Sequence, residues 1–296
     1  MVMAVVDSGT TNTRLRRMEN GRVTAELSRK VGARDGKRAL AEALSALLRE
    51  VPDAEKVILS GMITSPTGLL EVPHVPGPVE VTKLPLLRHD FPEIDPRPFY
   101  FVPGVAFRAG EMTCRDMMRG EETELLGYGT DSQSRVFLHA GSHHKAMRME
   151  GERLTASATA ITGELLSALA EHTLIASSLD LSVKADLTHF RQAAELTCAQ
   201  GFARAAFVLR MLDVQEHASP EMRLGWAYGM MAGEDLSLLL PMLADRPEVV
   251  FYGREAFCRA MAALPQMEGL RKRVLTQEES DLLAPAGAWR LGEKVS

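Results

Sequence analysis

Cysteine is scarce in this chain, and its three copies are scattered. Cys114, Cys198 and Cys258 lie far apart in the sequence and show no CxxC spacing. A disulfide framework or a structural zinc site needs paired or closely spaced cysteines. We therefore expect neither of these, and the pattern fits a protein of the reducing cytosol.

Basic stripes and long apolar runs are also absent. A net charge of −5 and a pI of about 6.0 argue against the positive surface that nucleic acids or acidic membranes attract. No run reaches the about 18 apolar residues of a membrane span, and the first residues have the pattern of a strand rather than of a basic leader. We expect a cytoplasmic enzyme without nucleic-acid or membrane partners.

What is present is the composition of an ordinary globular protein with an α/β pattern. The 296 residues, 46% of them hydrophobic, fit one large domain or two. We favour two, because a strand pattern like that of the opening starts again near residue 134. The first half predicts strands at 3–8, 12–17, 22–30, 56–60 and 99–102, helices at 39–51 and 120–127, and irregular site-lining loops over 61–104. The second half predicts strands at 134–140, on both sides of 150–152 and at 249–252, and helices from 162, over 190–212, over 220–239 and after 253.

The stretch VVDSGTTNTR at 5–14 predicts a hairpin that binds phosphate. An apolar strand leads to Asp7, and we expect Gly9 to supply the positive φ of a tight turn. Exposed backbone N–H groups and hydroxyls in such a turn form an anion site, and a carboxylate at the strand end suits hydrated Mg²⁺. The same residue types also occur in ordinary turns, so the alternative is a hairpin without a ligand. The candidate nucleotide-binding residues here are Ser8, Gly9, Thr10, Thr11 and Asn12.

A second candidate site is HAGSHHK at 139–145. A strand that ends in Gly141 and Ser142 and is followed by His143 and Lys145 can bind a phosphate or a carboxylate. A metal site made of the histidines is disfavoured, because adjacent strand residues point to opposite faces, and solvated surface histidines are the simpler alternative.

A third candidate is MRGEETE at 118–124. Arg119 can bind a carboxylate in bidentate fashion, and Glu121 or Glu122 can accept a hydroxyl proton as a general base. The alternative is purely structural, because acidic residues in the first turn of a helix are stabilised by its dipole.

Two further segments have both a binding and a structural interpretation. The strand–glycine–helix pattern FYGRE at 251–255 can admit a nucleoside at Gly253, or it can be a plain junction. Thr162 and Glu164 can contact substrate, although Thr162 also suits a helix N-cap.

Together these segments resemble the 2-dehydro-3-deoxygalactonokinase family, sugar-acid kinases of the actin/hexokinase/Hsp70-like superfamily. The matching motifs follow the family's order: DSGTTNTR at 7–14, SGM at 60–62, VPG at 102–104, MRGEETELLG at 118–127, GSHHK at 141–145 and ITGE at 161–164. The chain departs from the family at Ala146, where an aromatic residue is usual, and in its C-terminal segment. These departures bear on substrate identity more than on phosphate binding.

The resemblance implies an α/β fold of two ribonuclease-H-like, actin-like ATPase domains with mixed sheets flanked by helices and an intervening cleft. The domains are expected at 1–128, with the first phosphate hairpin and the sugar-acid loops, and at 129–296, with the second phosphate element and the nucleoside region. The implied activity is ATP-dependent phosphorylation of 2-dehydro-3-deoxy-D-galactonate to its 6-phosphate in galactonate catabolism.

For a kinase of this kind, with ATP and Mg²⁺ as cofactors, we assign expected roles to individual residues. Asp7 is expected to hold Mg²⁺, and Glu121 or Glu122 to act as base, with Asp116 in reserve. Gly141 and Ser142 are expected to bind phosphate. The candidate sugar-acid contacts are Arg119, His143, Lys145, Thr162 and Glu164.

Other activities and an oligomeric state stay open on the sequence. The acceptor can be the gluconate epimer or a related sugar acid. The chain can also be a phosphoanhydride hydrolase, or a non-catalytic sensor of a sugar acid or nucleotide. The partners expected are the small-molecule sugar acid and ATP, and whether the chain forms a homodimer is left open.

Overall fold

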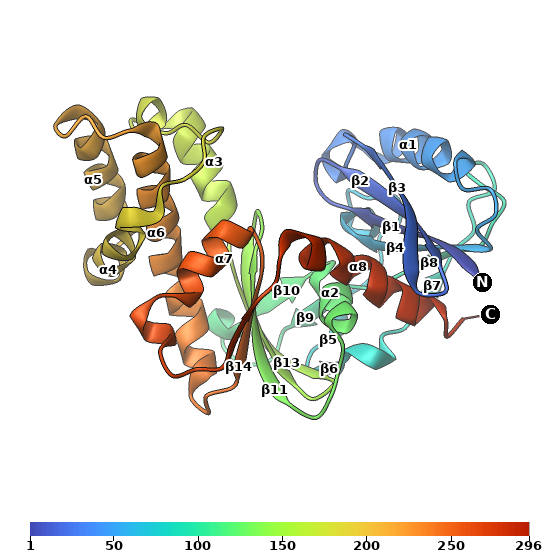
Figure 1. Ribbon diagram of the computed structural model, residues 1–296. Coiled ribbons are helices and arrows are strands. Elements are labelled where there is room, and N and C mark those ends of the chain that lie inside the picture. The colour runs from blue at the N-terminus through green and yellow to red at the C-terminus, as the bar shows by residue number, and fades with distance from the viewer. Residues whose placement is uncertain (296) are drawn as a thin grey trace. The chain divides into compact units, whose positions relative to one another are not determined.

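A computed structural model describes residues 1–295 and divides the chain into two compact units (Figure 1). The first unit contains Met1–Ser132, Glu150–Ala156 and the C-terminal segment from Glu278. The second contains Gln133–Met149 and Ser157–Gln277. No helix within residues 1–295 is both long and apolar enough to cross a membrane.

The first unit is built around a six-stranded sheet and a three-stranded sheet. Their orders are β3-β2-β1-β4-β8-β7 and β10-β9-β5. The strands of these two sheets are β1 (Val2–Ser8), β2 (Thr13–Glu19), β3 (Arg22–Arg29), β4 (Lys56–Gly61), β5 (Val75–Pro76), β7 (Leu87–Arg88), β8 (Phe99–Phe101), β9 (Val105–Phe107) and β10 (Asp116–Met118). The short strand β6 (Val79–Glu80) belongs to neither sheet and pairs antiparallel with Arg153 and Leu154, which are also part of the first unit. The helices are α1 (Lys37–Arg49), α2 (Glu121–Tyr128) and α8 (Gln277–Gly292).

One local turn and one long-range pairing set the strand register of the larger sheet. The dipeptide Asn20-Gly21 has positive φ at both residues, 50° and 78°, as a tight hairpin turn between β2 and β3 requires. β4 lies parallel to β1, with Asp7 opposite Ser60 and Ser8 opposite Gly61. The carboxyl ends of β1 and β4 therefore meet at one edge of the sheet.

Helices cover both faces of this sheet (Figure 1). The α1 side chains Leu44, Leu47 and Leu48 are fully buried in one cluster with Val6 and Leu59 of the sheet. On the opposite face, Lys56 of β4 donates to the main-chain oxygen of Gly292 at the end of α8 over 3.3 Å. Burial of the apolar α1 face, at ~25 cal/mol per Å², is the main force that fixes this helix on the sheet.

The second unit combines a sheet with a helical subdomain. The strands β11 (Ser134–Ala140), β12 (His144–Glu150), β13 (Arg153–Ala160), β14 (Glu248–Gly253) and β15 (Lys272–Val274) are ordered β15-β14-β11-β12-β13. The helices are α3 (Thr162–His172), α4 (Phe190–Gln200), α5 (Phe202–Val214), α6 (Pro220–Leu239) and α7 (Glu255–Ala262). Their core includes fully buried Leu138, Met230 and Phe251.

Most predicted helices and strands begin and end within one to three residues of the observed ones, but one prediction is wrong and several elements were not predicted. The helix expected over 190–212 is two helices, because Gly201, at φ +84°, ends α4 and starts α5. The strands β9 and β10 were not predicted, since each has only three residues. The long α8 was missed as well. Its apolar residues are not confined to one face, and Pro285 stands inside it.

Candidate active site

The predicted phosphate hairpin of the first unit is a short turn with exposed polar groups. Gly9 N donates to the Asn12 oxygen over 2.9 Å, and the hydroxyls of Ser8 and Thr13 lie 2.9 Å apart below the turn. Gly9, Thr10 and Asn12 are exposed. The expected positive φ at Gly9 is wrong, because the four-residue turn closes without a left-handed residue. The turn is nevertheless open enough for an anion to reach its donors.

A neighbouring loop supports the turn from behind. Ala33 N donates to the Gly9 oxygen and Arg34 N to the Thr10 oxygen, each over 3.1 Å. A Cβ atom on Gly32 would lie 2.3 Å from the Thr10 carbonyl carbon and the Thr11 nitrogen. The turn is therefore pre-organised, since its carbonyl groups are already bound on the side away from solvent.

Three separated motifs meet at the end of β1. A Cβ atom on Gly61 would lie 2.9 Å from Asp7 Oδ1 and 2.6 Å from the Ser8 oxygen. One on Gly120, the residue before α2, would lie 3.6 Å from Gly61 Cα. The DSG, SGM and RGEE segments thus form one site, in which the start of α2 approaches the Asp7 carboxylate.

The carboxylates of this site influence one another. Burial raises the pKa of Asp7, Arg16 and Arg14 oppose that rise, and the charge of Glu121 adds to it. Burial also raises the pKa of Glu122 to about 7, and the charge of Glu121 contributes in the same direction. A dense negative site of this kind favours a cation or a proton.

The two glutamates at the start of α2 have different surroundings. Glu122 is fully buried, and both of its carboxylate oxygens accept from Gly120 N, over 2.9 and 2.8 Å. Glu121 is half-buried and accepts from Arg119 N over 3.1 Å. These acidic side chains therefore lie in the first turn of α2, where the helix dipole stabilises negative charge. Glu121 is the more accessible of the two carboxylates.

Arg119 is engaged by the loop that follows β4. Its Nη1 donates to the Thr64 main-chain oxygen and hydroxyl, both over 2.6 Å, and its Nη2 donates to the Val72 oxygen over 3.0 Å. The ring of His74 lies 3.2 Å from Nη2, and burial followed by the charges of Arg119 and Arg108 lowers the His74 pKa. Arg119 orders this loop next to α2.

In the second unit, the turn after β11 is held against the start of α3. Glu164 N donates to the Ser142 oxygen over 2.8 Å, and a Cβ atom on Gly163 would lie 2.4 Å from the Gly141 oxygen. His143 Nε2 lies 2.9 Å from Glu164 Oε2, with both side chains exposed. The structure thus brings the GSHHK and ITGE segments together.

His144 points the other way, into the core. Its Nδ1 lies 2.5 Å from Asp235 Oδ2, and Thr162 donates to the other Asp235 oxygen over 3.2 Å. His144 and Asp235 have exposed fractions of 1% and 0%. The histidines therefore lie on opposite sides of β12, as the alternation of side chains along a strand requires. Lys145 is also buried.

The nucleoside candidate lies beside the same turn. β14 runs parallel to β11, with Tyr252 opposite His139 and Gly253 opposite Ala140. The rings of His139 and Tyr252 stack with centroids 4.7 Å apart. At Gly253, where φ is +104°, a Cβ atom would lie 2.6 Å from the Ala140 oxygen. Gly253 and Gly141 therefore end two adjacent strands.

The residues that sequence reasoning missed are Asp235, Thr64 and His74. Asp235 directly follows Glu234 within an otherwise apolar stretch of α6, and this acidic pair in an apolar run was a usable signal. The segment 64–74 carried no such signal, since its role depends on main-chain oxygens. Within residues 1–295, no group of three or more His, Cys, Asp or Glu side chains is arranged to hold a metal.

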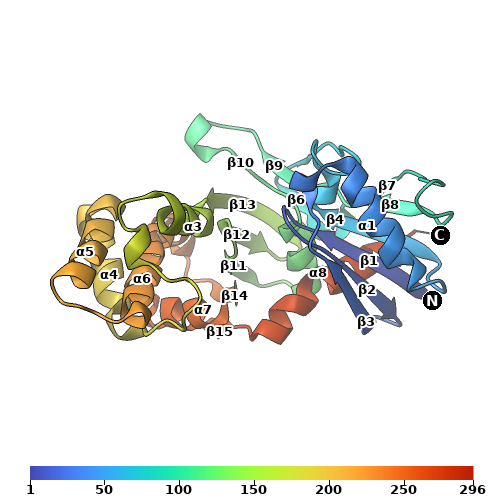
Figure 2. The ribbon, with the colours of Figure 1, turned by 90° about the horizontal axis from the view of Figure 1, so that it is seen from above.

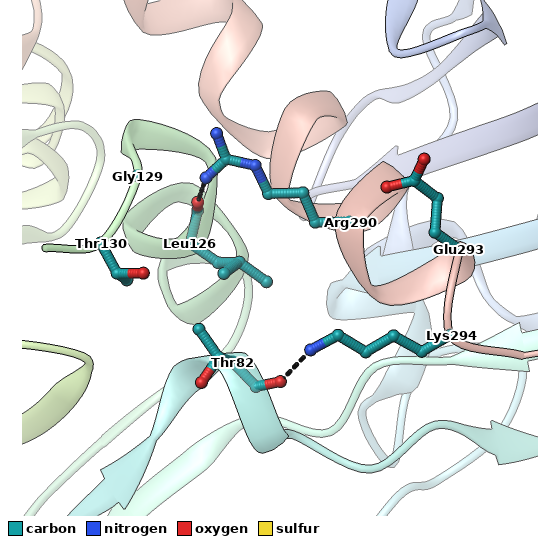
Figure 3. A pocket seen from close by; sticks show the side chains of 7 residues that line it. All are labelled: Thr82, Leu126, Gly129, Thr130, Arg290, Glu293 and Lys294. Carbon is teal, nitrogen blue, oxygen red and sulfur yellow. Dashed lines mark hydrogen bonds between the residues drawn. The ribbon is translucent and has the colours of Figure 1, made fainter.

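A separate cavity of about 440 Å³ lies in the first unit (Figure 3). Arg290 donates to the Leu126 oxygen at the end of α2, and Lys294 donates to the Thr82 oxygen. A cation at the end of a helix stabilises its free carbonyl groups. The lining residues are Thr82, Leu126, Gly129, Thr130, Arg290, Glu293 and Lys294, and none of them is a predicted site residue.

Similar proteins place this geometry in a known class. A crystal structure from Sinorhizobium meliloti, assigned as a 2-dehydro-3-deoxygalactonokinase, has a TM-score of 0.83 at 22% identity and covers 99% of this chain and 98% of that one. The ADPNP-bound activator of the 2-hydroxyisocaproyl-CoA dehydratase from Clostridium difficile has a TM-score of 0.54 at 15% identity, covering 99% and 95%. The fold is that of the actin-like ATPases, which confirms the predicted α/β class with mixed sheets.

The family follows from the sequence match. The 2-keto-3-deoxy-galactonokinase family model matches residues 7–291, so the chain belongs to that family of sugar-acid kinases, as the resemblance implied. "Probable 2-dehydro-3-deoxygalactonokinase DgoK1" of Rhizobium meliloti (strain 1021) is 30% identical over 183 residues, 60% of this chain. The 2-dehydro-3-deoxygalactonokinase of Escherichia coli (strain K12) is 25% identical over 123 residues, 42% of this chain. These alignments span 58% and 40% of the two relatives.

Proposed function

We propose that this chain transfers the γ-phosphoryl group of ATP to the 6-hydroxyl of 2-dehydro-3-deoxy-D-galactonate. The observation that carries the proposal is the meeting of Asp7, Gly61 and the start of α2 at one edge of the first sheet. It is supported by the family match over residues 7–291. Phosphoryl transfer depends mainly on alignment and charge neutralisation, and a pre-organised turn beside carboxylates suits both.

The proposal contains two phosphate-binding turns, and each is described within its own unit. The turn from Ser8 to Asn12 holds the β- and γ-phosphates through its N–H groups and hydroxyls. Gly141 and Ser142 hold phosphate at the turn after β11, and Gly253 borders the nucleoside. Each turn is supported from behind by main-chain hydrogen bonds, so little further ordering is needed when the nucleotide binds.

Mg²⁺ fits the residues around Asp7. The raised pKa of Asp7 and its interaction with Glu121 describe a negative site that a cation would stabilise. Mg²⁺ keeps several waters and needs only one or two carboxylates beside substrate phosphates. When bound, the ion neutralises charge on the transferring phosphoryl group. Asp7 is the residue that would hold the ion.

The general base in the proposal is Glu121, with Glu122 as the second candidate and Asp116 in reserve. The sugar 6-oxygen attacks the γ-phosphorus, and the bond to the β–γ bridging oxygen breaks. ADP leaves with that electron pair, and the hydroxyl proton passes to the carboxylate. Glu121 is preferred because it is half-buried, whereas both Glu122 oxygens already accept from Gly120 N.

The sugar-acid contacts remain those of the family pattern. We propose His143, Lys145, Thr162 and Glu164 in the second unit. In the first unit the proposed contact is Arg119, whose side chain also orders the 64–74 loop. We also propose domains at 1–128 and 129–296 and a cytoplasmic location, where the scattered cysteines stay reduced.

The test is ADP release from Mg-ATP by the purified protein with three acceptors. The reaction is run with 2-keto-3-deoxygalactonate, with its gluconate epimer and with no sugar acid. Turnover that requires the galactonate form supports the proposal. Faster turnover with the gluconate epimer would mean that the epimer is the substrate. Equal ADP release without a sugar acid would indicate a hydrolase, and binding without turnover would indicate a sensor.

A further inference from the structure

Two arginines at the open end of the β9–β10 hairpin have no assigned role. β9 and β10 pair antiparallel, with Phe107 opposite Asp116 and Ala106 opposite Met117. Continuing this register by one residue brings Arg108 opposite Arg115, where the two strands separate into the loop that extends from the sheet (Figure 2). Directly opposed residues of an antiparallel pair project to the same face.

The same two arginines line a cavity of about 300 Å³ in the first unit. Alternation along the strands puts Ala106 and Met117 on the arginine face, and Phe107 and Asp116 on the other. Ala106 is small and Met117 is 64% exposed, so the face between the arginines stays open. The complete lining is Ala106, Phe107, Arg108, Arg115, Asp116 and Met117.

The charges that line this cavity are unbalanced, because two arginines stand against one carboxylate, that of Asp116. Like charges directly opposite each other across two strands are destabilising. Both arginines are exposed, and neither side chain has a hydrogen bond or an ion pair within the described part of the chain. The charges of Arg108 and Arg119 both lower the pKa of His74. Arg119 is therefore a third cation in the neighbourhood of Arg108. An anion between the arginines would relieve the repulsion.

We propose that Arg108 and Arg115 form a clamp for the carboxylate of the sugar acid. This inference rests on the proposed function, because it assigns a subsite to the same substrate. Guanidinium groups bind carboxylates through paired, charge-assisted hydrogen bonds. Arg119 cannot supply this clamp alone, since both of its terminal nitrogens are held by the 64–74 loop. The cavity next to it provides two arginines whose donors are uncommitted.

The experiment compares Arg108→Gln, Arg115→Gln and the double variant with the unchanged protein. We expect each single substitution to raise KM for 2-keto-3-deoxygalactonate about 10- to 100-fold, the loss typical of one charged hydrogen-bond partner. KM for ATP and kcat at saturating sugar acid should stay within about 3-fold. Arg108→Lys should recover part of the loss. Arg204→Gln, a change at an exposed arginine of α5, is the matched control and should alter nothing.

A neutral substrate analogue separates charge recognition from damage to the fold. The methyl ester of 2-keto-3-deoxygalactonate should be a poor substrate of the unchanged protein, and the double variant should lose little further efficiency toward it. An unchanged KM for the acid, or a rise confined to ATP, would overturn the clamp. If no sugar acid is phosphorylated at all, the proposed function fails, and calorimetry with 2-keto-3-deoxygalactonate still decides the clamp. Binding lost only in the arginine variants supports it, and no binding by the unchanged protein refutes it.

Discussion

His144 Nδ1 and Asp235 Oδ2 lie 2.5 Å apart, and both side chains are excluded from solvent. Asp235 also accepts from Thr162, the first residue of α3, so one carboxylate links β12, α3 and α6. His144 Nε2 has no hydrogen-bond partner within residues 1–295. The imidazole ring packs edge-on against the ring of Phe257, with the two ring centroids 5.0 Å apart. A buried polar pair of this kind stabilises when complete and destabilises when one partner is removed.

The first prediction concerns this pair. His144→Ala and Asp235→Ala should each lower the free energy of unfolding by about 3 kcal/mol, because each change leaves the other group buried without its partner. The double variant should be less destabilised than the sum, with a coupling energy of about 2 kcal/mol in urea unfolding. His172→Ala, at an exposed position of α3, is the control. Strict additivity would show that the contact contributes nothing specific.

The second prediction concerns Asp7. Asp7→Asn should lower kcat by orders of magnitude and weaken the dependence of the rate on Mg²⁺, because the carboxylate that holds the water shell of the ion is lost. Stability should not fall, since burial disfavours the charged form of Asp7 and asparagine has no charge. Turnover under a Mg²⁺ titration and the thermal midpoint measure the two effects. Asp90→Asn, at an exposed ion pair with Arg88, is the control. Near-normal turnover of Asp7→Asn would contradict the assignment of Asp7 as the Mg²⁺-holding residue.

The third prediction is a pH dependence of stability caused by Glu122. Its pKa is raised from 4.5 to about 7 in the folded protein, so the folded state binds the proton more tightly than the unfolded state. The free energy of unfolding should therefore fall by roughly 3 kcal/mol as pH rises from 4.5 to about 7, at about 1.4 kcal/mol for each pKa unit. Glu122→Gln should abolish this slope in urea unfolding, whereas Glu93→Gln, at an exposed site, should keep it. An unchanged slope in Glu122→Gln would refute the buried-acid interpretation.

The fourth prediction separates the two candidate bases. If Glu121 accepts the proton, Glu121→Gln should lower kcat about 100-fold or more, while Glu122→Gln keeps most of the activity. If Glu122 accepts it, the rate should rise with an apparent pKa near 7, and only Glu122→Gln should lose that rise. The measurement is kcat against pH for both variants. Full activity in both would leave Asp116 as the remaining candidate.

The fifth prediction uses two glycines with nearly the same positive φ. Gly36 and Gly61 have φ of +87° and +81°, but nothing lies within 4 Å of a Cβ on Gly36, whereas one on Gly61 would contact Asp7 and Ser8. Gly36→Ala should cost about 1–2 kcal/mol from backbone strain alone. Gly61→Ala should cost at least about 1 kcal/mol more and should also lower kcat. Equal losses of stability in urea unfolding would mean that the neighbouring strand yields to the added methyl group.

The local elements could be predicted because their signals are local. The apolar spacing of α1 and the Asn20-Gly21 turn each depend only on residues a few positions apart in the sequence. Both elements are present as expected. The break at Gly201 was missed because the apolar pattern continues through it. The strands β9 and β10 were missed because three residues are too few to show a period.

The sequence by itself determined the family, the α/β class and the motifs that make up the site, because these depend on residue order and local spacing. Only the tertiary structure decided which motifs share a site and which atoms are already engaged. Gly61 and Gly120 reach Asp7 through the parallel pairing of β1 and β4 and the placement of α2. Arg119 is held by main-chain oxygens of the 64–74 loop, and His144 meets Asp235 across 91 residues of chain. Such contacts arise from packing between distant segments, and no local pattern encodes which partner a side chain meets.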